Sequence, residues 1–260
     1  MSKIPRLDYD QIASEYNQRY SSDPSQERSR ALLALAERVK AQRILEAGCG
    51  TGHWLNLLDS LTNGLYGLDF SAKMLHEAGK QSAQLKLTQG SAIRLPYCDN
   101  SFDFVYCVDA IHHFGDVQSF IAESFRTVRP GGVLAVVGSD PHSGDDHWYV
   151  YDYFDGVLAM DLRRFPSRRT IQDWLAEEGF QDITTEVVEQ IRDVYHGRDV
   201  LNDPFLKKNA TSQLATLSDD AYKSGIGKIK SAIADAESRK EGVAFSSDLC
   251  VKMTFGFKPV

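Results

Sequence analysis

The sequence predicts an α/β fold, a doubly wound and mainly parallel seven-stranded sheet that carries a helical lid insertion. From residue 42 onward, short apolar runs alternate with stretches of helical periodicity. Strands that alternate with helices imply right-handed crossovers and helices on both faces of a parallel sheet. The run at residues 102–108 is also typical of a strand that is buried on both faces. In such a sheet the ligand is expected at the carboxyl ends of the strands.

Each expected element has a local signal. The expected strands lie at residues 43–47, 64–68, 85–88, 102–108, 133–137, 183–188 and 249–257. Apolar residues recur at helical spacing over residues 9–20, 32–39, 54–61, 148–165 and 171–178. Two more helices are expected to begin after the capping residues Ser71 and Asp116. The Arg-Pro-Gly-Gly sequence at residues 129–132 predicts a tight turn.

The chain is expected to comprise an N-terminal helical cap at residues 1–40 and a larger domain at residues 41–260. Two segments of the larger domain, about 140–168 and 191–243, are expected to form a lid over the site. The second segment is a long insertion between two strands, with helix starts at Asp203 and Ser218. Insertions of this length in a compact domain usually have a function.

Composition and charge exclude several classes of protein. The 260 residues are 42% hydrophobic, carry a net charge of −7 and contain no run of five like charges, which argues against nucleic-acid or anionic-membrane binding. No apolar run is long enough for a membrane span, and the first residues lack a signal-peptide core. The four cysteines form no Cys-x-x-Cys pair. We therefore expect a cytoplasmic protein, monomeric or homodimeric, with reduced thiols and no metal.

A glycine-rich loop, Gly48-Cys49-Gly50-Thr51-Gly52, follows the first expected strand and opens a helix. Glycine lets the backbone turn sharply and approach a ligand, and the helix N-terminus adds partial positive charge. The third glycine of a dinucleotide-binding loop would stand at position 53, which is histidine here. Asp69 ends the second strand 19 residues after Gly50, where a carboxylate can accept both hydroxyls of a ribose.

In these features the sequence resembles the class I S-adenosyl-L-methionine (SAM)-dependent methyltransferases, and within them the small-molecule branch that includes the ubiquinone and menaquinone C-methyltransferases. Five blocks in the family's order carry the resemblance, at residues 44–52, 67–71, 90–96, 101–105 and 129–133. They cover about residues 44–138, whereas residues 139–260 match much less. The resemblance implies a Rossmann-like fold, SAM as cofactor and a small-molecule methyl acceptor.

The resemblance also implies which residues of this chain contact SAM. Glu46 would meet the ammonium group, above a loop formed by Gly48, Cys49, Gly50 and Gly52. Asp69 would hold the ribose. Phe70 and Met74 would flank the adenine ring, and Ser91 and Ala92 would lie near its amino group. Cys107 and Val108 would offer backbone carbonyls to the methionine moiety. The residues that resemble the family's capping elements over SAM are Tyr9, Tyr16 and Arg19. Ser91 stands where the family commonly has aspartate, so its contact with the adenine amino group weakens or passes to the backbone of Ala92. Arg19 would pair with the SAM carboxylate.

Two further groups of residues leave alternatives open. His112 and His113 follow the fourth strand, where one of them acts as a general base or both shape the pocket or contact SAM. The arginines at 163, 164, 168 and 169 clamp an anionic acceptor or form a solvated surface. The histidines and aspartates at residues 142–147 are better explained as a loop with a helix cap than as a metal site.

The sequence therefore predicts a SAM-dependent methyltransferase that acts on a small molecule by direct displacement. Transfer from a sulfonium needs in-line alignment more than a strong base. A non-catalytic SAM-binding partner or sensor remains an alternative because methyl transfer has no obligatory catalytic side chain. An NAD(P)-dependent oxidoreductase is a further alternative, which the spacing of the glycines opposes.

Overall fold

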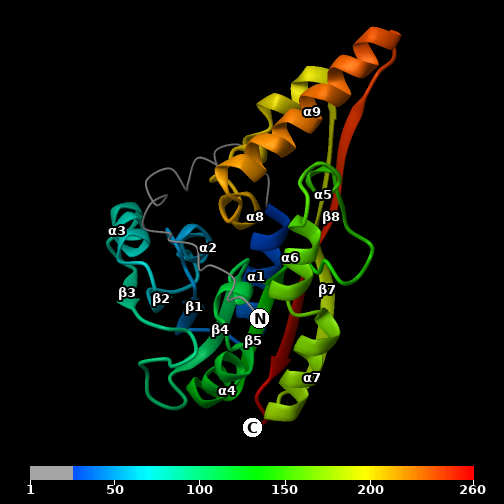
Figure 1. Cartoon of the computed structure of the whole chain (residues 1–260). Helices are drawn as coiled ribbons and strands as arrows, with labels where there is room; N and C mark the ends of the chain where they lie inside the picture. Colours follow the sequence, from blue (N-terminus) through cyan, green and yellow to red (C-terminus); the bar gives the residue numbers. More distant parts are fainter. Residues whose placement is uncertain (1–25) are drawn as a thin grey trace. The chain divides into compact units, whose positions relative to one another are not determined.

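The computed structural model describes residues 26–260 (Figure 1). Tyr9, Tyr16 and Arg19, together with most of the expected N-terminal cap, lie outside the described residues. The description begins with helix α1 (Gln26–Arg38). This helix corresponds to the second apolar stripe of the sequence, and Leu32 and Leu35 on it are buried.

The sheet has the predicted α/β topology and contains eight strands rather than seven. Its strands are β1 (Ile44–Ala47), β2 (Leu65–Asp69), β3 (Lys86–Gln89), β4 (Phe102–Val108), β5 (Val128–Gly138), β6 (His147–Trp148), β7 (Gln181–His196) and β8 (Ala244–Phe257). Their order is β3-β2-β1-β4-β5-β8-β6, and β7 pairs with β8. Strands β1 to β5 pair in parallel, whereas β8 runs antiparallel to β5. The extra strand, β6, has two residues, which is too short for a periodic signal in the sequence.

Several helices begin at residues whose side chains cap them. They are α2 (His53–Asn56), α3 (Ala72–Gln81), α4 (Val117–Thr127), α5 (Tyr149–Tyr153), α6 (Val157–Arg164), α7 (Arg168–Glu178), α8 (Ser212–Ala215) and α9 (Asp219–Arg239). The side chains of Ser71, Asp116 and Ser218 each accept a hydrogen bond from a backbone N–H three residues on, as expected for N-caps. Residues 26–260 also contain three short 3₁₀ segments: η3 (Ile111–His113), η4 (Gly197–Asn202) and η5 (Pro204–Leu206).

Two expected helices differ in the structure. The helix expected at 54–61 ends at Asn56, and bonds from Leu58 and Leu61 to the carbonyls three residues back continue it as turns. The helix expected at 148–165 is two helices, because Gly156 breaks it with a φ of 78°.

The tight turn expected at residues 129–132 lies inside β5. The register between β4 and β5 shifts there, so the Pro-Gly-Gly sequence forms an irregularity in the strand rather than its start. Gly131 N–H donates to the carbonyl of Lys258, and Lys258 N–H donates to the carbonyl of Gly132. Strand β7 also continues beyond the expected end at residue 188, to His196.

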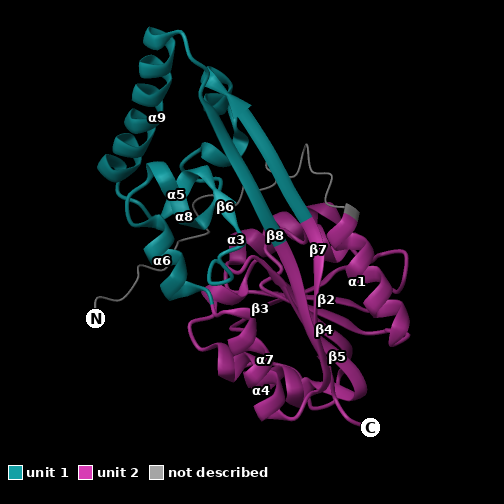
Figure 2. Cartoon of the chain, turned by 90° about the vertical axis from the view of Figure 1, so that its right-hand side faces the viewer, with its two compact units in different colours: residues 1–8, 141–165, 190–250 teal, residues 9–140, 166–189, 251–260 magenta. Residues whose placement is uncertain are grey.

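The described chain divides into two compact units (Figure 2). One unit contains residues 26–140, 166–189 and 251–260. Its core is built around β4, all seven of whose residues are buried, and helices α4 and α7 lie side by side against it (Figures 1 and 2). The carboxyl ends of β1, β2 and β4 meet at one edge of this sheet, because these strands are parallel neighbours.

The other unit contains residues 141–165 and 190–250, which include most of both expected lid segments. It has its own apolar core, in which Tyr149, Phe154 and Phe245 are almost completely buried. Inside it, the carboxylate of Asp161 accepts hydrogen bonds from Tyr151 (3.0 Å) and Gln213 (3.1 Å) and so joins α5, α6 and α8. Burial raises the pKa of Asp161 to about 6. None of the helices in the described chain is long and apolar enough to cross a membrane.

Two glycines of α9 give a matched test of this second core. A Cβ added at Gly225 would lie 2.2 Å from Cδ1 of Phe154, whereas a Cβ at Gly227 would meet nothing within 4 Å. We expect Gly227→Ala to stabilise the protein by up to about 1 kcal/mol through helix propensity. Gly225→Ala should instead destabilise it by about 1–3 kcal/mol because the added methyl overpacks the core. Chemical unfolding of both variants checks this, and equal effects would contradict the close packing of α9 on Phe154.

Candidate functional site

The glycine-rich loop connects β1 to α2 at the carboxyl edge of the sheet. Gly48, Gly50 and Gly52 all have positive φ angles, of 73°, 51° and 77°. The N–H groups of Gly48 and Cys49 both donate to the carbonyl of Leu68, at 2.7 and 3.0 Å, which ties the loop to the end of β2. A Cβ added at Gly48 would lie 2.7 Å from Cβ of Ala110. Only glycine therefore fits where the loop passes the segment after β4.

Asp69, the last residue of β2, holds two backbone segments at once. Its Oδ2 accepts from the N–H of Gly50 at 2.8 Å, and its Oδ1 accepts from the N–H of Ser71 at 2.8 Å. The side chain thus joins the glycine loop to the start of α3. Each carboxylate oxygen has a second lone-pair site, so the carboxylate can also accept from two adjacent hydroxyls of a ligand.

The two residues expected to flank an adenine ring have different surroundings. Phe70 follows Asp69 directly, and 58% of its surface is exposed. This is unusual for a large aromatic side chain, whose flat faces are suited to stacking on planar groups. Met74, one turn into α3, is 2% exposed and belongs to the core.

Glu46 lies in the middle of the buried strand β1 and is 1% exposed. Tyr106 donates a hydrogen bond to its Oε2 at 3.3 Å. Burial raises the pKa of Glu46 well above its usual range, the hydrogen bond from Tyr106 opposes this, and the charge of Asp69 adds to it. A carboxyl group in this position gains most from a cation brought to it by a ligand.

The other residues expected at the site lie around the same edge. Cys107 and Val108 end β4 and are buried, and Cys49 is buried in the loop. Burial raises the pKa of both Cys49 and Cys107, so these thiols stay protonated and unreactive. Ser91 follows β3, and its backbone pairs with that of Arg94 in an isolated antiparallel β-bridge. The neighbouring Ala92 is buried.

His112 and His113 form the short 3₁₀ segment η3 after β4. Their ring centroids are 3.9 Å apart and their planes are inclined by 48°. Both side chains are half-buried. The role of either histidine as a base stays a prediction.

The structure adds a charged cluster that the sequence analysis did not single out. Arg28 on α1 pairs with Asp109, at 2.9 Å, and with Glu189 on β7. Its guanidinium carbon lies 4.7 Å from the ring centroid of Trp54 on α2. The sequence signal that was available is Asp109 itself, an acidic residue directly after the buried strand β4.

The four arginines considered as an anion clamp have different roles within the fold. Arg168 donates from its guanidinium to carbonyl groups at the end of β5, and its backbone N–H donates to Asp140 at 2.9 Å. Arg164 donates to Ser212 at 3.0 Å and is buried. Arg163 is exposed, and Arg169 is exposed and paired with Asp173. Arg164 and Arg168 thus support the interiors of their own units.

No group of three metal-ligating side chains occurs within residues 26–260. The loop considered as a metal site is held by hydrogen bonds to residues that are distant in the sequence. His142 lies 2.8 Å from the carbonyl of Phe165, and Asp146 accepts from the N–H of Cys250 at 2.7 Å.

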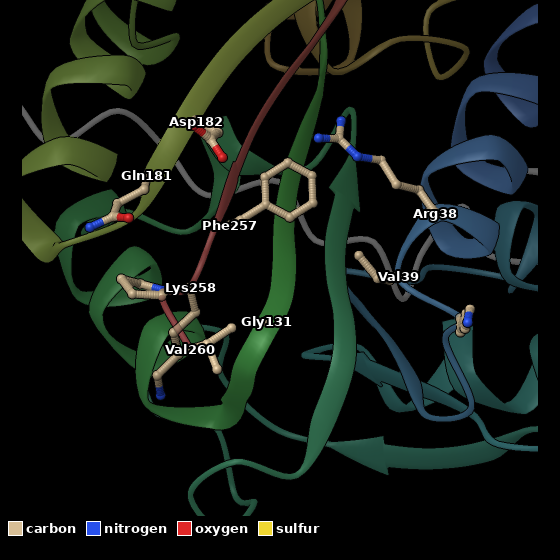
Figure 3. Close-up of a pocket in the computed structure, with 10 residues that line it drawn as sticks. Arg38, Val39, Gly131, Gln181, Asp182, Phe257, Lys258 and Val260 are labelled. Carbon is tan, nitrogen blue, oxygen red and sulfur yellow. The ribbon is translucent and has the colours of Figure 1, made fainter.

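A surface hollow of about 460 Å³ lies at the opposite end of the sheet (Figure 3). It is bounded by the end of α1, by Gly131 in β5, by Gln181 and Asp182 at the start of β7, and by the end of β8 with the residues that follow it. The amino ends of the parallel strands lie here, so the hollow is separate from the glycine loop and Asp69.

Comparison with known proteins finds matches to the part of the chain that contains the glycine loop and Asp69. Residues 45–136 match the family model described as a methyltransferase domain. The chain is 30% identical over 148 residues to a demethylmenaquinone methyltransferase of Geobacillus sp. (strain WCH70), an alignment that covers 53% of this chain and 63% of that relative. The match thus spans less than two thirds of the relative's length.

Solved structures share the fold at low sequence identity. The crystal structure of a putative methyltransferase from an antibiotic biosynthesis pathway of Anabaena variabilis superposes with a TM-score of 0.67 at 20% identity, over 88% of this chain and 95% of that one. The [4+2]-cyclase SpnF superposes with a TM-score of 0.55 at 20% identity, over the whole of both chains. The fold is therefore shared by proteins whose titles name different reactions.

Proposed function

We propose that residues 45–136, which match the family model described as a methyltransferase domain, form a class I SAM-dependent methyltransferase domain. In this proposal the chain binds SAM at the glycine loop and transfers its methyl group to a small-molecule acceptor. One observation carries the proposal. The carboxylate of Asp69 is held by N–H groups from both the glycine loop and the start of α3, beside an exposed phenylalanine ring. This arrangement suits a nucleoside, whose ribose and base lie next to each other.

The residues around the loop fit the chemistry of SAM. Asp69 would hold the ribose hydroxyls, Phe70 would lie against the adenine, and Glu46 would face the ammonium group. The buried carboxyl of Glu46 supports the fit, because burial without a cation raises its pKa. When bound, SAM supplies a methyl group on a positively charged sulfur. The protein's part is to align that group with the acceptor and to exclude water.

The acceptor is proposed to be a small molecule. The net charge of −7 disfavours nucleic acid, and the relative from Geobacillus is named for methyl transfer to a demethylmenaquinone. Residues 140–168 and 191–243 are proposed to cover the acceptor. His112 and His113 are proposed to shape the acceptor side, with one of them as base where the acceptor needs deprotonation. We place the protein in the cytoplasm as a monomer or homodimer.

Methyl-labelled SAM tests the proposal. The purified protein is incubated with labelled SAM and a cell extract, and small molecules are then separated from macromolecules. Label is expected in the small-molecule fraction, and Asp69→Ala should abolish it. Label in protein or nucleic acid would overturn the proposed class of acceptor.

A second function is SAM binding without methyl transfer. The observation that favours it is the likeness to a solved structure named as a cyclase, since one fold supports different chemistries. Tight SAM binding, measured by calorimetry, together with no label transfer from any extract would support this alternative.

The buried Glu46 predicts a pH dependence of SAM binding. A cation bound beside it favours the ionised carboxylate, so binding should release a proton and SAM affinity should rise with pH. The pH window runs from the lower pKa that Glu46 has beside the bound cation up to the raised pKa of the SAM-free protein. Calorimetry in buffers of different ionisation enthalpy measures the released proton. In Glu46→Gln, SAM binding should weaken and its pH dependence in this window should disappear.

The raised pKa of Glu46 also affects the stability of the folded protein, and here the Glu46→Gln variant is expected to gain rather than lose. Because the folded state raises the pKa of Glu46, ionisation destabilises the SAM-free protein as pH increases above 4.5. Glu46→Gln removes this cost and should raise the free energy of unfolding at pH 8 relative to the unmutated protein. A Gln variant that is both less stable and unchanged in SAM binding would contradict the proposed role.

A further inference from the structure

We propose that Arg28 is a positioning residue, which holds the backbone turn after β4 in the conformation that SAM binding requires. This inference rests on the proposed function. It concerns the charged cluster of Arg28, Asp109 and Glu189 beside Trp54, in which Arg28 connects helix α1 to three other elements.

The guanidinium of Arg28 is enclosed. Its side chain is 11% exposed, and that of Glu189 is 10% exposed. Nη1 of Arg28 lies 2.9 Å from Oδ2 of Asp109, Nε contacts Glu189, and the face of Trp54 lies 4.7 Å from the guanidinium carbon. Two carboxylates and an aromatic ring thus surround one cation, which fixes its position far better than a single exposed ion pair would.

Asp109 has a backbone conformation that needs such support. Its φ is 48°, in the left-handed region that most residues other than glycine avoid. Its N–H donates to the carbonyl of Val137 at 2.9 Å, which continues the β4–β5 ladder by one bond. A Cβ at Gly138 would lie 3.1 Å from Oδ1 of Asp109, so the carboxylate is closely confined on that side.

The turn at Asp109 lies between two parts of the proposed SAM site. Cys107 and Val108, just before it, are the residues whose carbonyls are expected to face the methionine moiety. Ala110, just after it, packs closely against Gly48, because a Cβ added at Gly48 would lie 2.7 Å from Cβ of Ala110. A change in the backbone of Asp109 would therefore move both parts. Arg28 opposes that change by holding the Asp109 carboxylate.

The test compares SAM dissociation constants by calorimetry for Arg28→Ala, Arg28→Lys, Asp109→Ala and Asp109→Gly. Arg28→Ala should weaken binding about tenfold, the size of a typical coupling between contacting residues. Arg28→Lys should restore part of the loss because it keeps the charge but not the planar fork. Asp109→Gly should bind SAM more tightly than Asp109→Ala, because glycine adopts the left-handed conformation without cost.

A double-mutant cycle shows whether Arg28 acts through the turn. When Asp109 is already glycine, Arg28→Ala should cause a much smaller loss of affinity than it does alone. Equal losses in the two backgrounds would overturn the proposal, because Arg28 would then act independently of Asp109.

Arg38 supplies the matched control for a merely structural effect. It is another arginine of α1, and its guanidinium carbon lies 4.3 Å from the ring centroid of Phe257, at the opposite end of the sheet (Figure 3). Arg38→Ala should leave the dissociation constant of SAM unchanged. If the unmutated chain binds no SAM, the proposed function fails. If it binds SAM and Arg28→Ala binds equally well, only the inference about Arg28 fails.

Discussion

Asp69→Ala is expected to weaken SAM binding by at least about 100-fold. The substitution removes the proposed ribose acceptor and also releases the N–H groups of Gly50 and Ser71, each of which donates to Asp69 at 2.8 Å. Hydrogen bonds to a charged group are worth about 1.5–3 kcal/mol each, and 1.4 kcal/mol corresponds to a tenfold change in affinity. Loss of one such contact, together with disorder of the loop, accounts for the expected loss of SAM affinity. Calorimetric titration with SAM measures it.

Two variants make this result specific. Asp69→Asn keeps one carbonyl acceptor and should bind SAM with intermediate affinity. Asp59 is an exposed aspartate of the same domain, so Asp59→Ala should leave SAM binding unchanged. A dissociation constant for Asp69→Ala within a factor of three of the unmutated protein would mean that the nucleoside does not lie at the end of β2.

Gly48→Ala is expected to destabilise the protein by about 2–5 kcal/mol. A left-handed residue other than glycine costs about 1–2 kcal/mol, and overpacking costs about 1–3 kcal/mol. Both apply here, because Gly48 has a φ of 73° and its Cβ would lie 2.7 Å from Cβ of Ala110. SAM binding should be lost as well, since relief of the clash moves the loop. Denaturant unfolding and calorimetry measure the two effects.

The two contributions can be separated. Gly115 has a φ of 79° and nothing within 4 Å of an added Cβ, so Gly115→Ala should cost only the backbone part. Adding Ala110→Gly to Gly48→Ala removes the closest contact and should recover part of the stability. If Gly48→Ala and Gly115→Ala were equally destabilising, the close packing of the loop on the segment after β4 would be wrong.

The glycine loop and the helix caps were predictable from the sequence because their interactions are local. Ser71, Asp116 and Ser218 each cap a helix by binding an N–H three residues on, and a short sequence window contains both partners. Strand β4 was predictable for a related reason. A strand buried on both faces shows its burial in its own residues.

Other elements depended on partners that are distant in the sequence. The Pro-Gly-Gly sequence after Arg129 has the composition of a turn, yet it lies within β5 and exchanges hydrogen bonds with Lys258. The apolar spacing at residues 148–165 was correct for both α5 and α6, but the spacing continues through Gly156 and hid the break between them.

The sequence by itself determined the fold class and the position of the glycine loop, because the loop glycines, Asp69 and the alternation of strands and helices are properties of short segments. Only the tertiary structure decided which charged groups meet at the site. Arg28 and Asp109 are 81 residues apart in the chain, and Glu189 comes from a third element. The short sequence segments around Arg28, Asp109 and Glu189 contain no signal that these residues pair. It exists because the fold brings helix α1, the end of β4 and strand β7 together, although they are distant in the sequence.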